Sequence, residues 1–337
     1  MKNKPWAASA ALLAGALLVA LAQGAPVPVT VGTFARAETD LYMRTSRFGA
    51  LEHQREMTDV DHQNVVRMNR DTLYSSGVFD LDAGPVTVRL PDPGKRFMSL
   101  QATSEDHYAV DVAYAPGRYT YTRDGVGTRY LFLAVRTLAD PGDPADMQAA
   151  HALQDAIRLE QPARGRFEVP DWDKGSQDRI RELLKGLGPL RGDDAGVMFG
   201  KRSDVDPVAH LIGTAIGWGG NPPAAAMYAS TTPAANDGRV VHRLVVKDVP
   251  VDGFWSISVY DADGYFHRNT LGAYSLNSIT AKRSADGSVP VQFGGCDGRI
   301  PNCLPVTQGW NYTVRLYRPR AEVLSGKWKF PEARAVP

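Results

Sequence analysis

Polar residues stand directly before a strand-like stretch in the first third of the chain. The segment Asn69-Arg70-Asp71 precedes residues 73–81, which follow a β pattern and include Tyr74. Asparagine and aspartate disfavour strand interiors and favour turns, so they mark the mouth of the strand, where ligands often bind. Two interpretations stay open. Either Asn69 and Asp71 make an Asx-type turn and Arg70 pairs with a carboxylate, or the group is a polar cluster that binds a ligand.

Two further residues could contribute to the same site. His107 follows Glu105 and Asp106 between two strand-like runs, where it could act as a general base. Trp218 lies in a glycine-rich loop, where its ring could stack on a sugar or an apolar ligand. Each has a structural alternative, which is a local turn for His107 and a packed core ring for Trp218.

Several classes of chemistry lack their motif. The sequence has no G-x-S-x-G nucleophile elbow, and Ser75 and Ser76 would point to opposite faces of one strand. Residues 195–202 lack the glycine and the Ser/Thr that a phosphate-binding P-loop requires. His62 and His107 stand near carboxylates but match no spaced metal motif, so we expect no metal and no cofactor.

The composition is that of an ordinary globular protein with about two domains. The chain has 337 residues, 43% of them hydrophobic and 22% charged, with a formal net charge of +1. A near-neutral chain without a basic tract argues against nucleic acid as a main partner. A small-molecule ligand is the expected partner, and a homo-oligomer stays open.

The first 24 residues have the order of an export signal. Lys2 and Lys4 precede an apolar run over residues 7–22, and small residues follow at Ala22 and Gly24. We expect a signal peptide cleaved after Gly24 or Ala22, because the apolar run is short of the ~20 residues that span a bilayer. The alternative is an uncleaved anchor. No later stretch predicts a membrane span, so we expect secretion across the inner membrane into the periplasm.

The two cysteines fit an oxidising compartment. Cys296 and Cys303 bracket a short loop, and such a pair predicts a disulfide. Closing a loop of about eight residues stabilises the native state by roughly 2–2.5 kcal/mol. The alternative is a metal-binding pair, but no second cysteine or histidine cluster flanks it.

Helix-like and strand-like segments alternate in blocks. The spacing predicts a helix over residues 33–56, strands from 73 to 136, and a helical middle with helices over 145–161, 177–187 and 208–216. Ser176 is the expected N-cap of the helix over 177–187, and Asp206, followed by a proline, that of the helix over 208–216. The last third returns to strands separated by Asp-Gly turns. This pattern predicts an α+β, β-rich fold with two β-sandwich or jelly-roll-like domains, a central helical segment and an N-terminal helix.

Two long motifs resemble known domains. Residues 68–75 (Met-Asn-Arg-Asp-Thr-Leu-Tyr-Ser), followed by Val-Phe-Asp-Leu at 78–81, resemble the signature of the DUF1254 domain. Residues 253–266 resemble the DUF1214 domain, as do 274–278, 285–288 and 314–319. The resemblance implies a two-part structure of sandwich-like sheets with helices between them, of a type that is common in bacteria and often exported. It brings no catalytic residue set.

With this resemblance we divide the chain into four parts: a signal peptide (1–24), a DUF1254-like domain (33–165), a helical linker segment (166–236) and a DUF1214-like β domain (237–330). We expect an exported protein that binds a small polar or carbohydrate-like ligand in a cleft between the domains. The expected binding residues are Asn69, Arg70, Asp71, Tyr74, His107 and Trp218. The alternative is a periplasmic hydrolase or lyase. In it His107 is the general base, Arg70 stabilises developing negative charge, and Asp71 is the third catalytic candidate.

Overall fold

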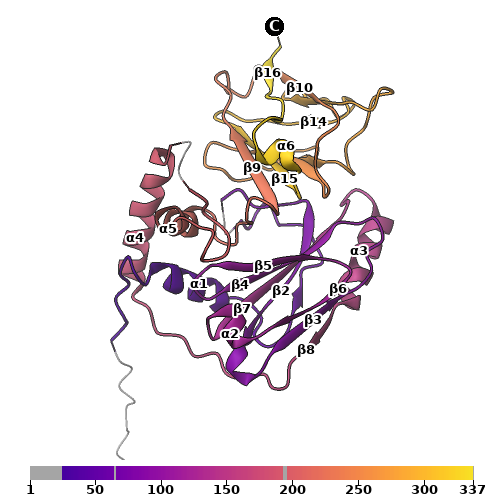
Figure 1. Cartoon of the computed structure of the whole chain (residues 1–337). Coiled ribbons are helices and arrows are strands. Elements are labelled where there is room, and N and C mark those ends of the chain that lie inside the picture. The colour runs from indigo at the N-terminus through magenta and orange to yellow at the C-terminus, as the bar shows by residue number, and fades with distance from the viewer. Residues whose placement is uncertain (1–24, 64–65, 193–195, 337) are drawn as a thin grey trace, which may run out of the picture.

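Two sandwich domains, with helices beside the first, make up the molecule (Figure 1). The computed structural model describes residues 25–63, 66–192 and 196–336. The predicted signal peptide, residues 1–24, lies outside the described residues. Within the described ranges, every helix falls short of the length and hydropathy that a membrane span requires.

The N-terminal domain packs a five-stranded antiparallel sheet on a three-stranded one. The larger sheet has the order β1 (Glu52–His53), β2 (Thr72–Asp80), β7 (Tyr130–Leu138), β4 (Met98–Ser104), β5 (Ala109–Tyr114). The smaller sheet has the order β6 (Gly117–Tyr121), β3 (Val86–Leu90), β8 (Arg158–Glu160). Alternate residues of the strands, such as Leu100 and Leu133, meet Val88 in the core between the two sheets. The other face of the larger sheet is left for helices and loops.

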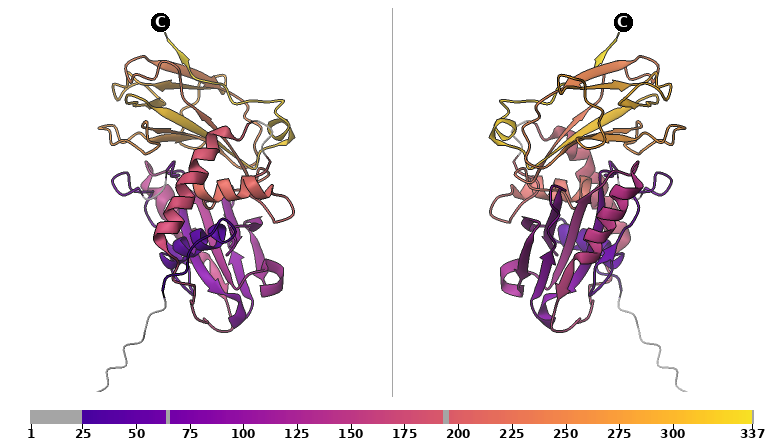
Figure 2. Two further views of the ribbon diagram at one scale, coloured as in Figure 1. Left: turned by 90° about the vertical axis from the view of Figure 1, so that its left-hand side faces the viewer. Right: turned by 90° about the vertical axis from the view of Figure 1, so that its right-hand side faces the viewer.

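Helices flank this domain on two opposite sides (Figures 1 and 2). On one side α3 (Pro144–Ala156) packs Ala150 near Leu73 of β2. On the other side three helices share a small core: α1 (Phe34–Arg44), α4 (Lys174–Leu187) and α5 (Pro207–Ile216). The remaining helical turns are short: η1 (Leu81–Ala83), α2 (Arg123–Val126), η2 (Gly188–Leu190) and α6 (Ala321–Leu324).

The C-terminal domain is a sandwich of two four-stranded sheets. One is antiparallel, with the order β12 (Ser275–Asn277), β11 (Trp255–Tyr260), β15 (Asn311–Tyr317), β9 (Ala226–Thr231). The other has the order β14 (Cys303–Leu304), β13 (Val289–Phe293), β10 (His242–Val246), β16 (Arg334–Ala335), in which β13 and β14 run parallel. Ile257, Phe293 and Trp310 belong to the buried core of this domain. The predicted β-rich α+β fold with two sandwiches is therefore confirmed.

Local signals in the sequence predicted several features correctly. The carboxylate of Asp206 caps α5, accepting from the backbone N–H groups of Val208 and Ala209. The Cys296–Cys303 disulfide is present, with an S–S distance of 2.03 Å. The cap of α4 differs from the prediction, because the helix begins at Lys174 and its N-cap is Asp173.

Two predicted helices are too long. The helix expected over 33–56 ends at Arg44, because the chain then turns to the sheet, where the N–H of Gly49 (φ +70°) donates to the Val78 carbonyl at 2.8 Å. The helix expected over 145–161 ends at Ala156, and the residues after it form β8 on the small sheet. The segment 166–236, predicted to be helical, also contains β9, an edge strand of the C-terminal sheet.

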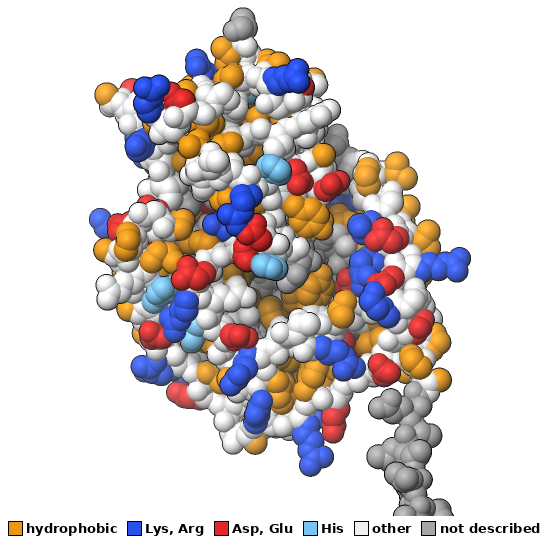
Figure 3. Space-filling view, turned by 180° about the vertical axis from the view of Figure 1, so that it is seen from behind, with side chains coloured by type: hydrophobic (Ala, Val, Ile, Leu, Met, Phe, Trp, Pro, Cys, Tyr) orange, Lys and Arg blue, Asp and Glu red, His pale blue; other side chains and the backbone are white. Residues whose placement is uncertain are grey.

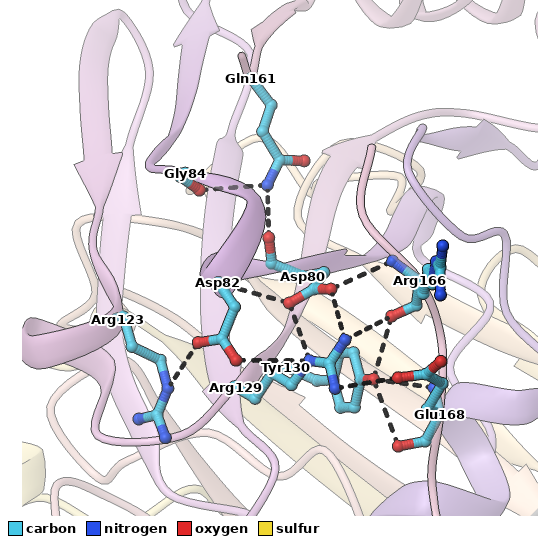
Figure 4. A network of polar contacts seen from close by, with 9 residues as sticks. All are labelled: Asp80, Asp82, Gly84, Arg123, Arg129, Tyr130, Gln161, Arg166 and Glu168. Atoms are coloured by element: carbon cyan, nitrogen blue, oxygen red, sulfur yellow. Dashed lines mark hydrogen bonds and ion pairs between the residues drawn. The ribbon is translucent and has the colours of Figure 1, made fainter. Parts of the chain in front are cut away.

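A polar network fixes the connection between α3 and α4 to the end of the large sheet (Figure 4). Asp80, the last residue of β2, accepts from Arg129 Nη2 at 2.9 Å and from the backbone N–H of Arg166 at 3.1 Å. Arg129 also pairs with Glu168 at 3.3 Å. Arg129 thus has acidic partners of its own, which indicates a structural role for the network.

Candidate functional site

His107 is a packed residue of the N-terminal domain and only 3% exposed. Its Nε2 accepts a hydrogen bond from the backbone N–H of Gly219 at 2.9 Å, so Nδ1 carries the proton and donates to Thr214 Oγ1 at 2.8 Å. Burial, helped by the nearby His210, lowers the pKa of His107 to about 3. The ring is therefore neutral near pH 7, and both of its nitrogens are already engaged.

Trp218 is also packed. Its ring stacks on Tyr42 and His107, with centroid separations of 4.3 and 5.6 Å. Its Nε1 donates to Thr39 Oγ1 at 3.1 Å, and Phe132 meets the ring edge. The structure thus brings Trp218 and His107 together, and their contacts fix the loop after α5 on the large sheet.

Arg70 and His107 lie at opposite ends of the large sheet. Arg70 precedes β2, whose first residue pairs with Leu138 on β7, whereas His107 follows β4, whose last residue pairs with Leu131. At about 3.3 Å per residue, these two positions on β7 are roughly 23 Å apart. A reaction in which Arg70 and His107 act on one small substrate has no support in this geometry.

Arg70 contacts the C-terminal domain and lines a separate cavity. Its guanidinium donates to the Thr58 carbonyl and lies 5.1 and 5.9 Å from the ring centroids of Tyr274 and Phe266. The cavity, of about 360 Å³, runs along α3. None of the other predicted site residues lines this cavity.

Asp71 is buried between the two domains. Its backbone N–H donates to Asn69 Oδ1 at 2.7 Å, which is the Asx-type turn considered from the sequence. Its Oδ1 accepts from the Asn277 amide at 3.2 Å. Burial raises the pKa of the Asp71 carboxyl above its usual range, although Arg315 opposes the rise. These contacts make Asp71 a residue of the domain interface.

A cluster of aromatic and polar side chains surrounds one arginine where the domains meet. We call it the junction cluster, and it consists of Tyr74, Gln101, Arg136, Asn221, Tyr228 and Tyr317. Its members come from β2, β4 and β7 of the first domain, from the loop after α5, and from β9 and β15 of the second. On the face of the molecule drawn in Figure 3, acidic, basic and histidine side chains also gather along the boundary between the domains.

Arg136 forms the centre of the junction cluster. Its Nη1 donates to Gln101 Oε1 at 2.7 Å, its Nη2 donates to the Gly219 carbonyl at 3.3 Å, and its guanidinium lies 5.5 Å from the ring centroid of Tyr74. A longer contact of 3.5 Å reaches Asn221 Oδ1. All of these acceptors are neutral, so the cation has no opposite charge among its hydrogen-bond partners in the described structure.

Arg136 keeps its charge although it is only 7% exposed. Burial alone would disfavour the guanidinium, but the pKa of Arg136 is raised, because Tyr74, Tyr317 and Tyr228 favour the cation. An arginine cannot shed its proton to escape burial, so its positive charge persists in a medium of low polarity. An anion brought to this point would be strongly attracted.

Two phenol hydroxyls of the cluster are held by amides. The Asn69 amide donates to the Tyr317 hydroxyl at 3.0 Å, and the Asn221 amide donates to the Tyr228 hydroxyl at 2.8 Å. A hydroxyl that accepts one hydrogen bond can still donate its own hydrogen. Tyr228 is 43% exposed, so solvent reaches the cluster from this side.

Of this cluster, Tyr74 was predicted from the sequence, together with its neighbour Asn69, whereas Gln101, Arg136 and Tyr317 were not. Arg136 carries the clearest signal in the sequence, since it interrupts the apolar run 130–135 of a strand that is buried along nearly its whole length. A charged residue is rarely buried without a partner, so this position marks a specific environment. Tyr228 and Tyr317 carry no comparable signal, because tyrosine is common in strands.

Family models match both domains of the chain. Residues 48–125 match the family described as "Protein of unknown function (DUF1254)", and residues 225–321 match "Protein of unknown function (DUF1214)". None of the curated proteins matches the chain.

Two solved structures share the fold. The VPA0106 protein from Vibrio parahaemolyticus is 19% identical, with a TM-score of 0.70 over 91% of this chain and 98% of its own. An uncharacterized protein from Burkholderia cenocepacia is 13% identical, with a TM-score of 0.52 over 91% of this chain and 87% of its own. At these identities the likeness concerns the fold alone. The two family matches show that the chain belongs to the family of two-domain proteins that join a DUF1254 domain to a DUF1214 domain.

Proposed function

We propose that this chain is an exported binding protein whose junction cluster takes a small polar ligand with an anionic group. The observation that carries the proposal is the buried cation of Arg136, whose hydrogen-bond acceptors are all neutral. A planar guanidinium matches the two oxygens of a carboxylate, and the attraction is strong where water is largely excluded. An acidic sugar or a hydroxy acid has this chemistry.

The tyrosines of the cluster suit the rest of such a ligand. A phenol ring offers an apolar face for a sugar ring and a hydroxyl that donates to oxygen. Tyr74 belongs to the first domain, whereas Tyr228 and Tyr317 belong to strands of the second. A bound ligand would therefore contact both domains at once.

Two features of the sequence support export. The first 24 residues have the order of a signal peptide, and the single disulfide suits an oxidising compartment such as the periplasm. A hydrolase or lyase is less well supported than a binding protein. His107, the proposed base, is buried, neutral and hydrogen-bonded at both nitrogens.

A thermal-shift screen of the mature, oxidised protein tests the proposal. Sugars, sugar acids and small hydroxy acids form the panel. A ligand at about one hundred times its dissociation constant adds about 2.7 kcal/mol to the unfolding free energy. We expect acidic members of the panel to raise the melting temperature and their neutral counterparts to have a smaller effect.

Variants locate the binding. Arg136→Gln is expected to remove the shift, and Tyr228→Phe, which deletes one hydroxyl, to weaken binding about tenfold. Arg118→Gln serves as the control, because Arg118 lies on the same domain but is exposed and already paired with Glu160. A ligand that binds Arg136→Gln as tightly as the wild type would place the site elsewhere. A panel without any hit would contradict the proposal.

A further inference from the structure

The cavity along α3 is lined by apolar side chains and by polar or charged ones. Pro144, Met147, Gln148 and His151 recur at helical spacing, so they lie on one face of α3 and form one wall. Met57 belongs to the facing segment, and Arg70 also lines the cavity. The volume of about 360 Å³ lies within the range of small-molecule sites.

Arg70 is the one cation that permanently carries its charge among the residues lining this cavity. Its guanidinium donates to the Thr58 carbonyl and faces the rings of Tyr274 and Phe266, so these contacts are with neutral groups. Within the described part of the chain, no carboxylate oxygen lies within 4 Å of it. Glu56 is the acidic residue of the lining, and it is exposed. Burial also lowers the pKa of Arg70, although Tyr274 and, from beyond 4 Å, the carboxylates of Asp59 and Asp71 oppose the fall.

The other lining groups favour an apolar body with few polar atoms. Met57, which is 8% exposed, and Met147 belong to one apolar cluster, and Pro141 adds to the lining. Thioether side chains adapt to ligands of varied shape. His151 Nε2 lies 2.8 Å from the Arg55 carbonyl, which can only accept, so this nitrogen carries the proton and is already engaged.

This cavity and the junction cluster lie on opposite faces of the large sheet. Leu73 of β2 packs against Met57 and α3, on the side of the cavity. Its neighbour Tyr74 lies beside Arg136, in the junction cluster. Successive residues of a strand point to opposite faces. The two arginines therefore serve separate sites.

We propose that the cavity along α3 binds a small organic carboxylate with an apolar body. The carboxylate pairs with the Arg70 guanidinium, and the body lies against Met57, Met147 and the two prolines. This site is independent of the ligand proposed for the junction cluster.

Calorimetric titration of the mature, oxidised protein with three probes tests this inference. Hexanoate carries both features, hexan-1-ol has the apolar body without the charge, and inorganic phosphate has charge without the body. We expect hexanoate to bind at least tenfold more tightly than either of the others. Equal affinity for hexan-1-ol would overturn the role of Arg70, equal affinity for phosphate would overturn the apolar wall, and no binding of hexanoate would overturn the site.

Variants then locate the hexanoate. Arg70→Gln is expected to weaken binding at least tenfold, and Met147→Gln to weaken it severalfold. Arg268→Gln is the matched control, because this arginine is exposed and paired with Asp61. Arg136→Gln should bind hexanoate like the wild type, even if it loses the ligand of the junction cluster. Loss of hexanoate in Arg136→Gln but not in Arg70→Gln would overturn the assignment. If Arg70→Gln does not fold, the comparison of the three probes on the wild type still decides.

Discussion

The side-chain amide of Asn277, in the C-terminal domain, donates a hydrogen bond of 3.2 Å to the carboxyl group of Asp71, in the N-terminal domain. Asp71 is 0% exposed and Asn277 is 2% exposed, so the bond lies in the dry part of the interface. The guanidinium of Arg315 acts on the same carboxyl electrostatically. The two domains therefore meet through polar groups whose partners come from the opposite domain.

Removing the Asp71 carboxyl should destabilise the whole molecule. Asp71→Ala leaves a buried amide without its acceptor and Arg315 with less compensation, so we expect a loss of about 3 kcal/mol in the free energy of unfolding. The amide of Asp71→Asn keeps an oxygen that can accept from Asn277, so this variant should cost less, about 1 kcal/mol. Urea unfolding measures both.

The exposed variant Asp263→Ala is the control and should change the unfolding free energy by less than about 0.5 kcal/mol. Equal losses in Asp71→Ala and Asp71→Asn would contradict this account of the interface.

Glu105 and His107, two residues apart, should respond to pH in opposite directions. Burial raises the pKa of Glu105 to about 7 against the pull of Arg36, and the Asp40 carboxyl adds to the rise. The stability from this raised pKa is complete below about pH 4.5 and is lost as the pH rises to 7. The lowered pKa of His107, about 3, gives stability that is present above pH 6.5 and is lost as the pH falls.

Between pH 4.5 and 6.5 the two residues change the unfolding free energy with pH in opposite directions. Variants that remove one residue at a time should therefore separate the two effects. Relative to the wild type, the unfolding free energy of Glu105→Gln should rise with pH, and that of His107→Gln should fall, each by on the order of 1 kcal/mol per pH unit. Urea unfolding at pH 4.5, 5.5 and 6.5 gives the comparison. Glu182→Gln, exposed on α4, should keep the wild-type profile. Slopes of the same sign in the two buried variants would refute the assignment.

The disulfide should make a measurable contribution to stability. Cys296 and Cys303 close a short loop, so the double variant Cys296→Ser/Cys303→Ser should lower the unfolding free energy by roughly 2–2.5 kcal/mol. Reduction of the wild-type protein should have the same effect, and the reductant should leave the double variant unchanged. A wild-type protein that unfolds identically with and without reductant would disprove the contribution.

Local signals predicted the elements better than they predicted the site. Asp206 followed by proline indicated the start of α5, because a cap depends on neighbouring residues alone. The helix over 33–56 was overpredicted, since Phe48 and Leu51 continue the apolar spacing but pack with the sheet instead.

The site itself depends on contacts between distant parts of the chain. Arg136 donates hydrogen bonds to Gln101 and Gly219, which are far away in the sequence. Only the strand order could show that Arg70 and His107 lie at opposite ends of one sheet. A polar residue at a strand mouth is visible in the sequence, but the side chains that it meets are not.

The passage from α5 to β9 leaves no free linker between the domains. Gly219 is bonded to His107 and Arg136, and the Gly220 carbonyl accepts from Gln101 at 2.9 Å, so the loop after α5 is fastened to the first domain. Residue 226 already pairs in the second domain. Neither sandwich can rotate or unfold without disturbing the contacts of the other. A calorimeter should therefore record a single melting peak, with equal calorimetric and van't Hoff enthalpies, for a chain that carries two domain families.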